Sequence, residues 1–246
     1  MKAQAMILAA GRGQRMRPLT DAVPKPLLSV QGKPLMQWPL EALARGGVDH
    51  VAVNTGWLGD QIPAHFGEHL SLGDVGALRI TYSHEGRGDG EALETAGGIA
   101  RALPLLDEVF WLAAGDVFAP GFVFSPQARA RFAASDALAH LWLVPNPAHN
   151  PRGDFGISNA GLALNLPADA TAPRHTYSTI GLYRAALFAT PWCDIAPGNP
   201  DGLQAPLAPL LRAAMSAGRV SAELYTGAWT DVGTPERLAQ LNAAPA

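Results

Sequence analysis

Two stretches near the N-terminus organise this chain: AMILAAGRGQRMRPLT at residues 5–20 and PKPLL at residues 24–28. The first begins as an apolar run and stops abruptly at Gly11, as a buried strand does where it enters a turn. Gly11 and Gly13 lack a Cβ atom, so backbone N–H groups there can turn toward a bound anion. The pattern therefore predicts a strand that leads directly into a phosphate-binding loop.

Arginine and lysine side chains add positive charge to this predicted loop. Arg12, Arg15 and Arg17 lie within it, and a guanidinium group can hold phosphate oxygens through two parallel hydrogen bonds. Lys25 stands between two prolines, which fix their own φ angles and favour extended conformations in the residues before them. We therefore expect Lys25 to lie on a stiff segment, and we interpret the whole region as a triphosphate-binding site.

Two common nucleotide-binding patterns are absent from this region. The dinucleotide fingerprint G-x-G-x-x-G fails because Met16 stands where the third glycine is needed, and no G-K-[ST] follows the glycines. A nicotinamide-dependent oxidoreductase is therefore disfavoured.

Composition restricts the remaining possibilities. The 246 residues have a net charge of −3, are 48% hydrophobic and 16% charged, and contain one cysteine, Cys193. A chain without a Lys/Arg block is not expected to bind nucleic acid, and a single cysteine excludes an internal disulfide. The apolar run at 5–10 is too short for a signal peptide, and no run reaches transmembrane length. We expect a cytoplasmic protein that binds no membrane.

The order of predicted elements indicates an α/β fold. Strand-like runs at 3–10, 48–54, 78–83 and 109–114 alternate with helical patterns at 35–45, 60–69 and 94–103. This alternation is typical of a Rossmann-like, mostly parallel central sheet flanked by helices in three α/β/α layers. The second half adds strands at 138–145, 176–183 and 219–225, a hairpin at 155–166, a loop at 190–204 over or near the site, a helix at 208–217 and a final helix from Thr234.

Two aspartates follow predicted strands. Asp116 comes directly after the apolar strand at 109–114, and Asp231 follows a strand-like run that ends at Trp229. Ligands bind at the carboxyl ends of parallel strands, and Mg²⁺ is usually held by one or two carboxylates together with phosphate oxygens. Each aspartate is either a turn cap or a ligand to Mg²⁺, with Mn²⁺ as an alternative metal.

These motifs together resemble the signature of the sugar-1-phosphate nucleotidyltransferases, roughly L-A-x-G-x-G-[TS]-R-[LM]-x-P-L-T followed by P-K-P. The chain has Gln14 where most members carry Thr or Ser. GDVF at 115–118 and WTDVGT at 229–234 resemble the family's G-D and W-x-D-x-G-T motifs, and Glu85 with LETAGG at 93–98 resembles its E…L-x-T-A-G-G segment.

The resemblance implies transfer of a nucleotidyl group to a sugar 1-phosphate, with Arg15 and Lys25 as catalytic residues and Asp116 and Asp231 as metal ligands. The implied nucleotide-binding residues are Leu8, Ala10, Gly11, Arg12, Gly13, Gln14, Arg15, Lys25, Glu85, Gly98 and Ala114. Asn146, Asp154 and Tyr177, in or beside polar loops, are candidate sugar contacts. The inserted stretch 87–90 leaves the role of Glu85 open.

The segment NPAHNPRGDF at 146–155, taken with LETAGG, looks most like the bacterial branch of this family that joins UTP to N-acetylmuramic acid 1-phosphate in peptidoglycan recycling. Mannose-1-phosphate guanylyltransferases and glucose-1-phosphate thymidylyltransferases stay open as alternatives, as does a non-catalytic nucleotide-binding regulatory subunit. We expect one domain over 1–246, with a nucleotide-binding part at roughly 1–118 and a sugar-binding part at roughly 119–233. We expect no C-terminal β-helix, and a monomer or small homo-oligomer.

Overall fold

The structure is a computed structural model that describes residues 2–86 and 92–243. Its strands are β1 (Ala3–Ala9), β2 (Ser29–Val30), β3 (Lys33–Pro34), β4 (His50–Thr55), β5 (His69–Ser71), β6 (Ala77–His84), β7 (Leu106–Ala114), β8 (Val117–Phe118), β9 (Ala139–Val144), β10 (Gly156–Ile157), β11 (Ala163–Leu164), β12 (Thr176–Arg184), β13 (Val220–Leu224) and β14 (Thr230–Asp231). Its α-helices are α1 (Gln37–Arg45), α2 (Gln61–Phe66), α3 (Glu94–Ala102), α4 (Pro126–Ala134), α5 (Leu207–Ser216) and α6 (Pro235–Ala243).

Within the described residues, eight strands form one central sheet in the order β13-β9-β12-β7-β1-β4-β6-β5. β1 pairs in parallel with β4 on one side and β7 on the other, whereas β12 and β5 run antiparallel to their neighbours. The predicted mostly parallel sheet is confirmed. The chain first adds β4 and β6 on one side of β1 and then adds β7 on the other side, so the strand order reverses at β1. In open α/β sheets, ligands bind beyond the carboxyl ends of the strands at such a switch point.

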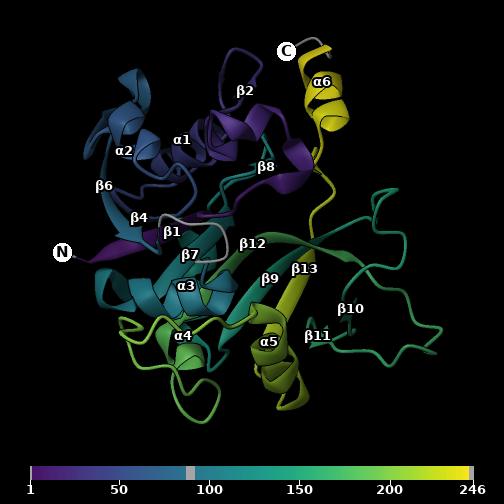
Figure 1. The fold of residues 1–246 in the computed structure, drawn as a ribbon. Coiled ribbons are helices and arrows are strands. Elements are labelled where there is room, and N and C mark those ends of the chain that lie inside the picture. Colours follow the sequence, from purple (N-terminus) through teal and green to yellow (C-terminus); the bar gives the residue numbers. More distant parts are fainter. Residues whose placement is uncertain (1, 87–91, 244–246) are drawn as a thin grey trace.

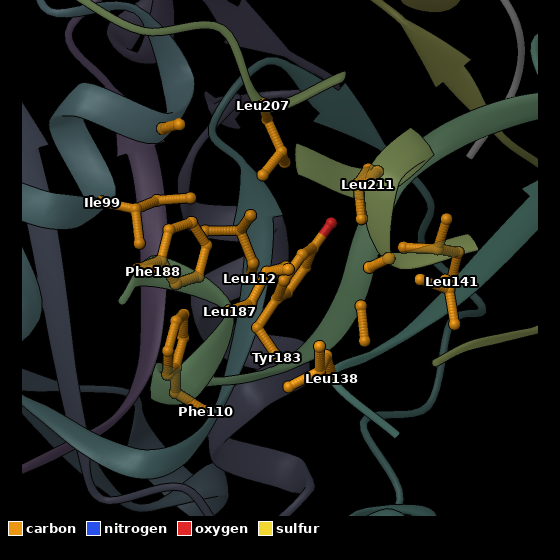
Figure 2. Packing of buried hydrophobic residues seen from close by; sticks show 14 of the residues in the cluster. Ile99, Phe110, Leu112, Leu138, Leu141, Tyr183, Leu187, Phe188, Leu207 and Leu211 are labelled. Atoms are coloured by element: carbon orange, nitrogen blue, oxygen red, sulfur yellow. The ribbon is translucent and has the colours of Figure 1, made fainter. Parts of the chain in front are cut away.

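Helices cover both faces of the sheet, as predicted. Side chains alternate along each strand, so Met6 of β1 packs on the face covered by α3 and α5, whereas Ile7 packs on the face covered by α1 and α2 (Figure 1). Figure 2 shows the first of these clusters, in which Ile99 of α3 and Leu211 of α5 pack over Phe110 and other sheet residues. Burial on both faces holds β1 and its following loop in place.

Two segments differ from the sequence-based expectations. The helix expected at 60–69 ends at Phe66, because Gly67 adopts a positive φ of 65°, and His69–Ser71 is instead the edge strand β5. Helix α4 was not predicted. Its N-cap is Ser125, whose hydroxyl accepts a hydrogen bond from the Ala128 N–H, and a proline follows at the first helical position, a common arrangement at helix starts.

The loop at 190–204 lies along α3 and contributes no lining residue to the cavities near the carboxyl ends of the central strands. Asn199 is fully buried, and its Nδ2 donates to the carbonyl oxygen of Gly97 at 3.1 Å; the Gly198 N–H donates to the Ala100 carbonyl at 2.8 Å. Over residues 2–86 and 92–243, no helix combines the length and apolar character that crossing a membrane requires.

Candidate active site

A cavity of about 430 Å³ opens at the carboxyl ends of the central strands. The strand registers set Leu8 beside Asn54 of β4 and Ala114 of β7, so the turns after all three strands meet there. The lining residues are Leu8, Ala9, Ala10, Gly11, Gly13, Gln14, Arg15, Met16, Lys25, Pro26, Asn54, Glu85, Ala92, Glu94, Thr95, Ala114, Asp116, Thr179 and Gly233. Most of the predicted nucleotide-binding residues are among them, whereas Arg12 and Gly98 are not.

The side chain of Arg12 braces the loop after β1. Its guanidinium lies 3.7 Å from the ring centroid of Trp57 and donates to Asp21 Oδ1 at 3.1 Å. The hydrogen bond from Arg12 is the main reason that the pKa of the Asp21 carboxyl is lowered, and Arg17 pairs with the same carboxylate at 2.8 Å. Of the three arginines predicted to supply charge, Arg15 is the one that lines the cavity.

Two features of the structure require a glycine at position 13. The φ of 65° at Gly13 lies in the left-handed region, which side chains with a Cβ rarely adopt. A Cβ atom there would also stand 3.1 Å from Thr20 Cγ2 and 3.3 Å from Lys25 Cβ. The glycine therefore lets the loop approach the segment that carries Lys25.

Lys25 and Asp116 form an ion pair across the cavity. Lys25 begins a short 3₁₀ helix, Lys25–Leu27, after extended Pro24, and its side chain is only 11% exposed. Asp116 follows β7, as predicted, and both residues line the cavity. The structure thus sets a predicted phosphate-binding cation directly against a predicted metal ligand.

The second predicted metal ligand lies on the neighbouring short strand. β14 pairs antiparallel with β8, and the Val232 N–H donates to the Asp116 carbonyl at 2.9 Å, so Asp231 and Asp116 belong to adjacent segments. Within the described part of the chain, no group of three or more His, Cys, Asp or Glu side chains is arranged to hold a metal. Two carboxylates are nonetheless the protein donor set that Mg²⁺ commonly takes when substrate phosphates and water supply the other oxygens, so the donors fit that ion.

Glu85 is buried against the cavity wall. Its Oε1 accepts from Asn54 Nδ2 at 2.6 Å, and its Oε2 accepts from the Leu93 N–H at 2.9 Å. Burial raises the pKa of this carboxyl, against the opposing effect of the two hydrogen bonds. Gly98 lies behind the carboxylate, where a Cβ would stand 2.1 Å from Oε1. The inserted Arg87–Gly90 stretch lies outside the described residues.

A second cavity of about 490 Å³ adjoins the first and shares Leu8, Glu94, Thr95 and Thr179 with it. Its other lining residues are Leu112, Asp154, Phe155, Tyr177, Pro206, Leu207, Ala208, Leu211 and Arg212. Two of the three predicted sugar contacts, Asp154 and Tyr177, therefore share one cavity wall. The two cavities therefore lie side by side, and residues from both halves of the chain line them.

The third predicted sugar contact, Asn146, lies outside both sets of lining residues. Its Nδ2 donates to the Arg174 carbonyl at 3.0 Å, and its Oδ1 accepts from the Thr176 hydroxyl at 3.0 Å. Asp154 is fixed by the Tyr177 N–H, which donates to its Oδ2 at 2.8 Å. In this structure Asn146 secures the loop that carries Asp154.

Residues that the sequence-based predictions did not assign lie where the two cavities meet. Glu94 and Thr179 line both cavities and have positive φ angles of 56° and 61°. Such backbone costs about 1–3 kcal/mol per residue and is concentrated at functional sites. Arg212 of α5 was also missed, because a cation on an exposed helix face has the pattern of an ordinary surface residue.

The chain is similar to known proteins in both sequence and fold. Residues 4–246 match the family model described as nucleotidyl transferase. The chain is 43% identical, over 98% of its length and 97% of the relative, to N-acetylmuramate alpha-1-phosphate uridylyltransferase of Neisseria meningitidis serogroup B. It is 33% identical to the Caulobacter vibrioides protein of the same name, over 94% and 92% of the two chains. The crystal structure of a putative glucose-1-phosphate thymidylyltransferase from Bacillus anthracis has the same fold, with a TM-score of 0.78 at 20% identity over 98% and 94% of the chains.

Proposed function

The chain belongs to the nucleotidyl transferase family, and we propose that it transfers the uridylyl group of UTP to N-acetylmuramic acid 1-phosphate, giving UDP-N-acetylmuramic acid and pyrophosphate in peptidoglycan recycling. The observation that carries this proposal is the pair of joined cavities, one bordered by Arg15 and Lys25 and the other by Arg212. The first suits a nucleoside triphosphate, and in the second Arg212, beside the carboxylates of Glu94 and Asp154, is the group that could pair with a further negative charge on the sugar.

The reaction needs no general base. A phosphate monoester has a second pKa of about 6, so the attacking oxygen is already an anion near neutral pH. That oxygen forms a bond to the α-phosphorus while the bond from the α-phosphorus to the bridging oxygen breaks, and pyrophosphate leaves with the electron pair. The protein must bring two anions together and hold them in line, so its contribution is positioning and charge stabilisation.

Named residues take separate roles in this proposal. The backbone from Gly11 to Arg15 and the Arg15 side chain bind the β- and γ-phosphates. Lys25 exchanges its partner Asp116 for oxygens of the α-phosphate and the sugar phosphate. Asp116 and Asp231 would hold Mg²⁺, or Mn²⁺, which neutralises phosphate charge when bound.

The choice of sugar rests on Arg212. Among the described residues that line the second cavity, Arg212 is the cationic one. N-acetylmuramic acid carries a lactyl carboxylate, which glucose, mannose and N-acetylglucosamine lack, and guanidinium binds carboxylate well. This favours the uridylyltransferase over the glucose thymidylyltransferase and mannose guanylyltransferase alternatives.

A matched pair of substrates tests the proposal. With UTP, the wild-type kcat/KM should be at least about tenfold higher for N-acetylmuramic acid 1-phosphate than for N-acetylglucosamine 1-phosphate, since hydrogen bonds to charged groups contribute about 1.5–3 kcal/mol. Arg212→Gln should remove most of this preference without changing the rate with N-acetylglucosamine 1-phosphate. Arg131→Gln removes an exposed arginine on α4, outside both cavities, and is the control that should keep the wild-type preference. Equal wild-type rates with both sugars would contradict the assignment.

A further inference from the structure

Asp231 is held by two side chains that come from distant parts of the sequence. Arg237 Nη1, on α6, donates to Asp231 Oδ1 at 2.6 Å and to the Asp231 carbonyl oxygen at 2.8 Å. His149 Nε2, in the loop at 146–154, lies 2.8 Å from the same Oδ1. Because a carboxylate oxygen can only accept, the imidazole donates from Nε2, and the 3.2 Å approach of Nη1 to Nε2 is packing between two donors.

Both of these contacts fall on one oxygen of the carboxylate. Oδ1 receives Arg237 and His149, whereas Oδ2 has no partner among residues 2–86 and 92–243. A carboxylate that is fixed through one oxygen presents the other in a defined direction. The arrangement therefore leaves Oδ2 as the carboxylate oxygen open to a ligand that the described residues do not supply.

Packing contacts of α6 support Arg237. Its side chain is 16% exposed, and Leu238 and Leu241 of the same helix pack on a small apolar cluster that includes Met16 of the phosphate-binding loop. Asn242 fastens the end of α6 to the β2–β3 hairpin, where its Oδ1 accepts from the Gln31 N–H at 2.7 Å. The hairpin follows the segment that carries Lys25, so α6 is anchored on the same part of the fold as the cation.

The backbone beside Asp231 also leaves room for the guanidinium. A Cβ atom at Gly233 would stand 2.8 Å from Arg237 Nη2 and 3.2 Å from its Cζ. The glycine of the WTDVGT motif thus allows Arg237 to lie against the turn.

We propose that Arg237, assisted by His149, is a positioning residue for the metal: it fixes Oδ1 of Asp231 so that Oδ2 is available to the divalent cation. This inference rests on the proposed function in one respect, namely that Asp231 is a metal ligand. Groups that orient a metal-binding side chain typically alter metal affinity by 10- to 100-fold when they are removed. Arg237 touches neither substrate nor metal in this role.

The test is a Mn²⁺ titration of the enzyme saturated with UTP and lacking sugar phosphate, monitored by water-proton relaxation, together with the Mg²⁺ dependence of turnover. Arg237→Gln should raise the dissociation constant for Mn²⁺ at least tenfold, and high Mg²⁺ should restore its turnover. Arg237→Lys should be intermediate, because lysine keeps the positive charge but not the fixed donor geometry of a guanidinium. His149→Ala should have a smaller effect, and Arg131→Gln should match the wild type.

The variant Asp231→Asn distinguishes a wrong positioning role of Arg237 from a wrong metal assignment of Asp231. If it weakens Mn²⁺ binding while Arg237→Gln and Arg237→Lys bind like the wild type, the positioning role is wrong and Asp231 remains a ligand. If Asp231→Asn also binds like the wild type, the metal assignment in the proposed function fails, and the role of Arg237 fails with it. Loss of turnover in Arg237→Gln that high Mg²⁺ does not restore, with an unchanged Mn²⁺ affinity, would reduce Arg237 to a structural residue.

Discussion

Replacing Gly98 by alanine tests how the wall of the nucleotide cavity is built. An alanine in a helix interior ordinarily stabilises a protein by about 1 kcal/mol relative to glycine. At this position in α3, however, the new Cβ would stand 2.1 Å from Glu85 Oε1 and 3.1 Å from Asn54 Nδ2. The 2.1 Å separation is too short for non-bonded atoms, so the Glu85 carboxylate must move.

The expected cost follows from the bonds that the movement breaks. Glu85 accepts one hydrogen bond from Asn54 and one from the Leu93 N–H, and each bond to a charged group contributes about 1.5–3 kcal/mol. Loss of both, offset by the helix gain of about 1 kcal/mol, predicts that Gly98→Ala lowers the free energy of unfolding by roughly 2–5 kcal/mol. Because Asn54 and Glu85 line the cavity, the KM for UTP should also rise.

Urea unfolding followed by circular dichroism measures the effect, and a second background isolates its cause. In Glu85→Ala the carboxylate is absent, so adding Gly98→Ala there should cost much less than it does in the wild type. Gly98→Ala that is as stable as the wild type would refute the reasoning. An equal loss in both backgrounds would place the clash elsewhere.

Three further predictions concern charge and protonation. Lys25→Ala should lower kcat/KM about a hundredfold or more, as removal of a donor that stabilises developing charge does, with an unchanged circular dichroism spectrum; near-wild-type kinetics would contradict its role. A chelator should abolish turnover and Mg²⁺ should restore it, and both Asp116→Asn and Asp231→Asn should need more Mg²⁺; wild-type Mg²⁺ titrations in both variants would leave these aspartates as structural residues. Burial raises the pKa of Glu85 above its ordinary 4.5. Between these two pKa values the folded state binds a proton that the unfolded chain releases. The contribution of Glu85 to the free energy of unfolding should therefore fall as pH rises above 4.5, until the raised pKa is passed. Urea titrations of wild type and Glu85→Ala across this range measure that contribution, and a difference that does not change with pH would contradict it.

Local patterns in the sequence were sufficient to predict every strand of the central sheet except the edge strand β5. The apolar run that stops at Gly11 became β1 and its loop, and the run before Asp116 became β7, because buried strands need continuous apolar residues. Helix α4 gave a weaker signal: Phe132 is its one buried residue, so its sequence has little apolar periodicity.

Side-chain directions at the site could not be predicted in the same way. From their charge, both Arg12 and Arg15 were predicted to bind the phosphates. The Arg12 guanidinium instead stacks on Trp57, which comes from another segment of the chain, and the loop sequence alone does not predict that contact. The contact between Lys25 and Asp116 likewise joins residues 91 positions apart. Arg212 lines a cavity only because α5 packs next to α3, β11 and β13, and helix periodicity does not predict such packing.

The assignment of UTP and N-acetylmuramic acid 1-phosphate as substrates is tested most directly by the initial rate of pyrophosphate release. That rate is measured for every pairing of UTP, GTP and TTP with the 1-phosphates of N-acetylmuramic acid, glucose and mannose. We predict the highest kcat/KM with UTP and N-acetylmuramic acid 1-phosphate. A higher value with GTP and mannose 1-phosphate, or with TTP and glucose 1-phosphate, would contradict the substrate assignment, and no release with any pair would favour a regulatory nucleotide-binding subunit.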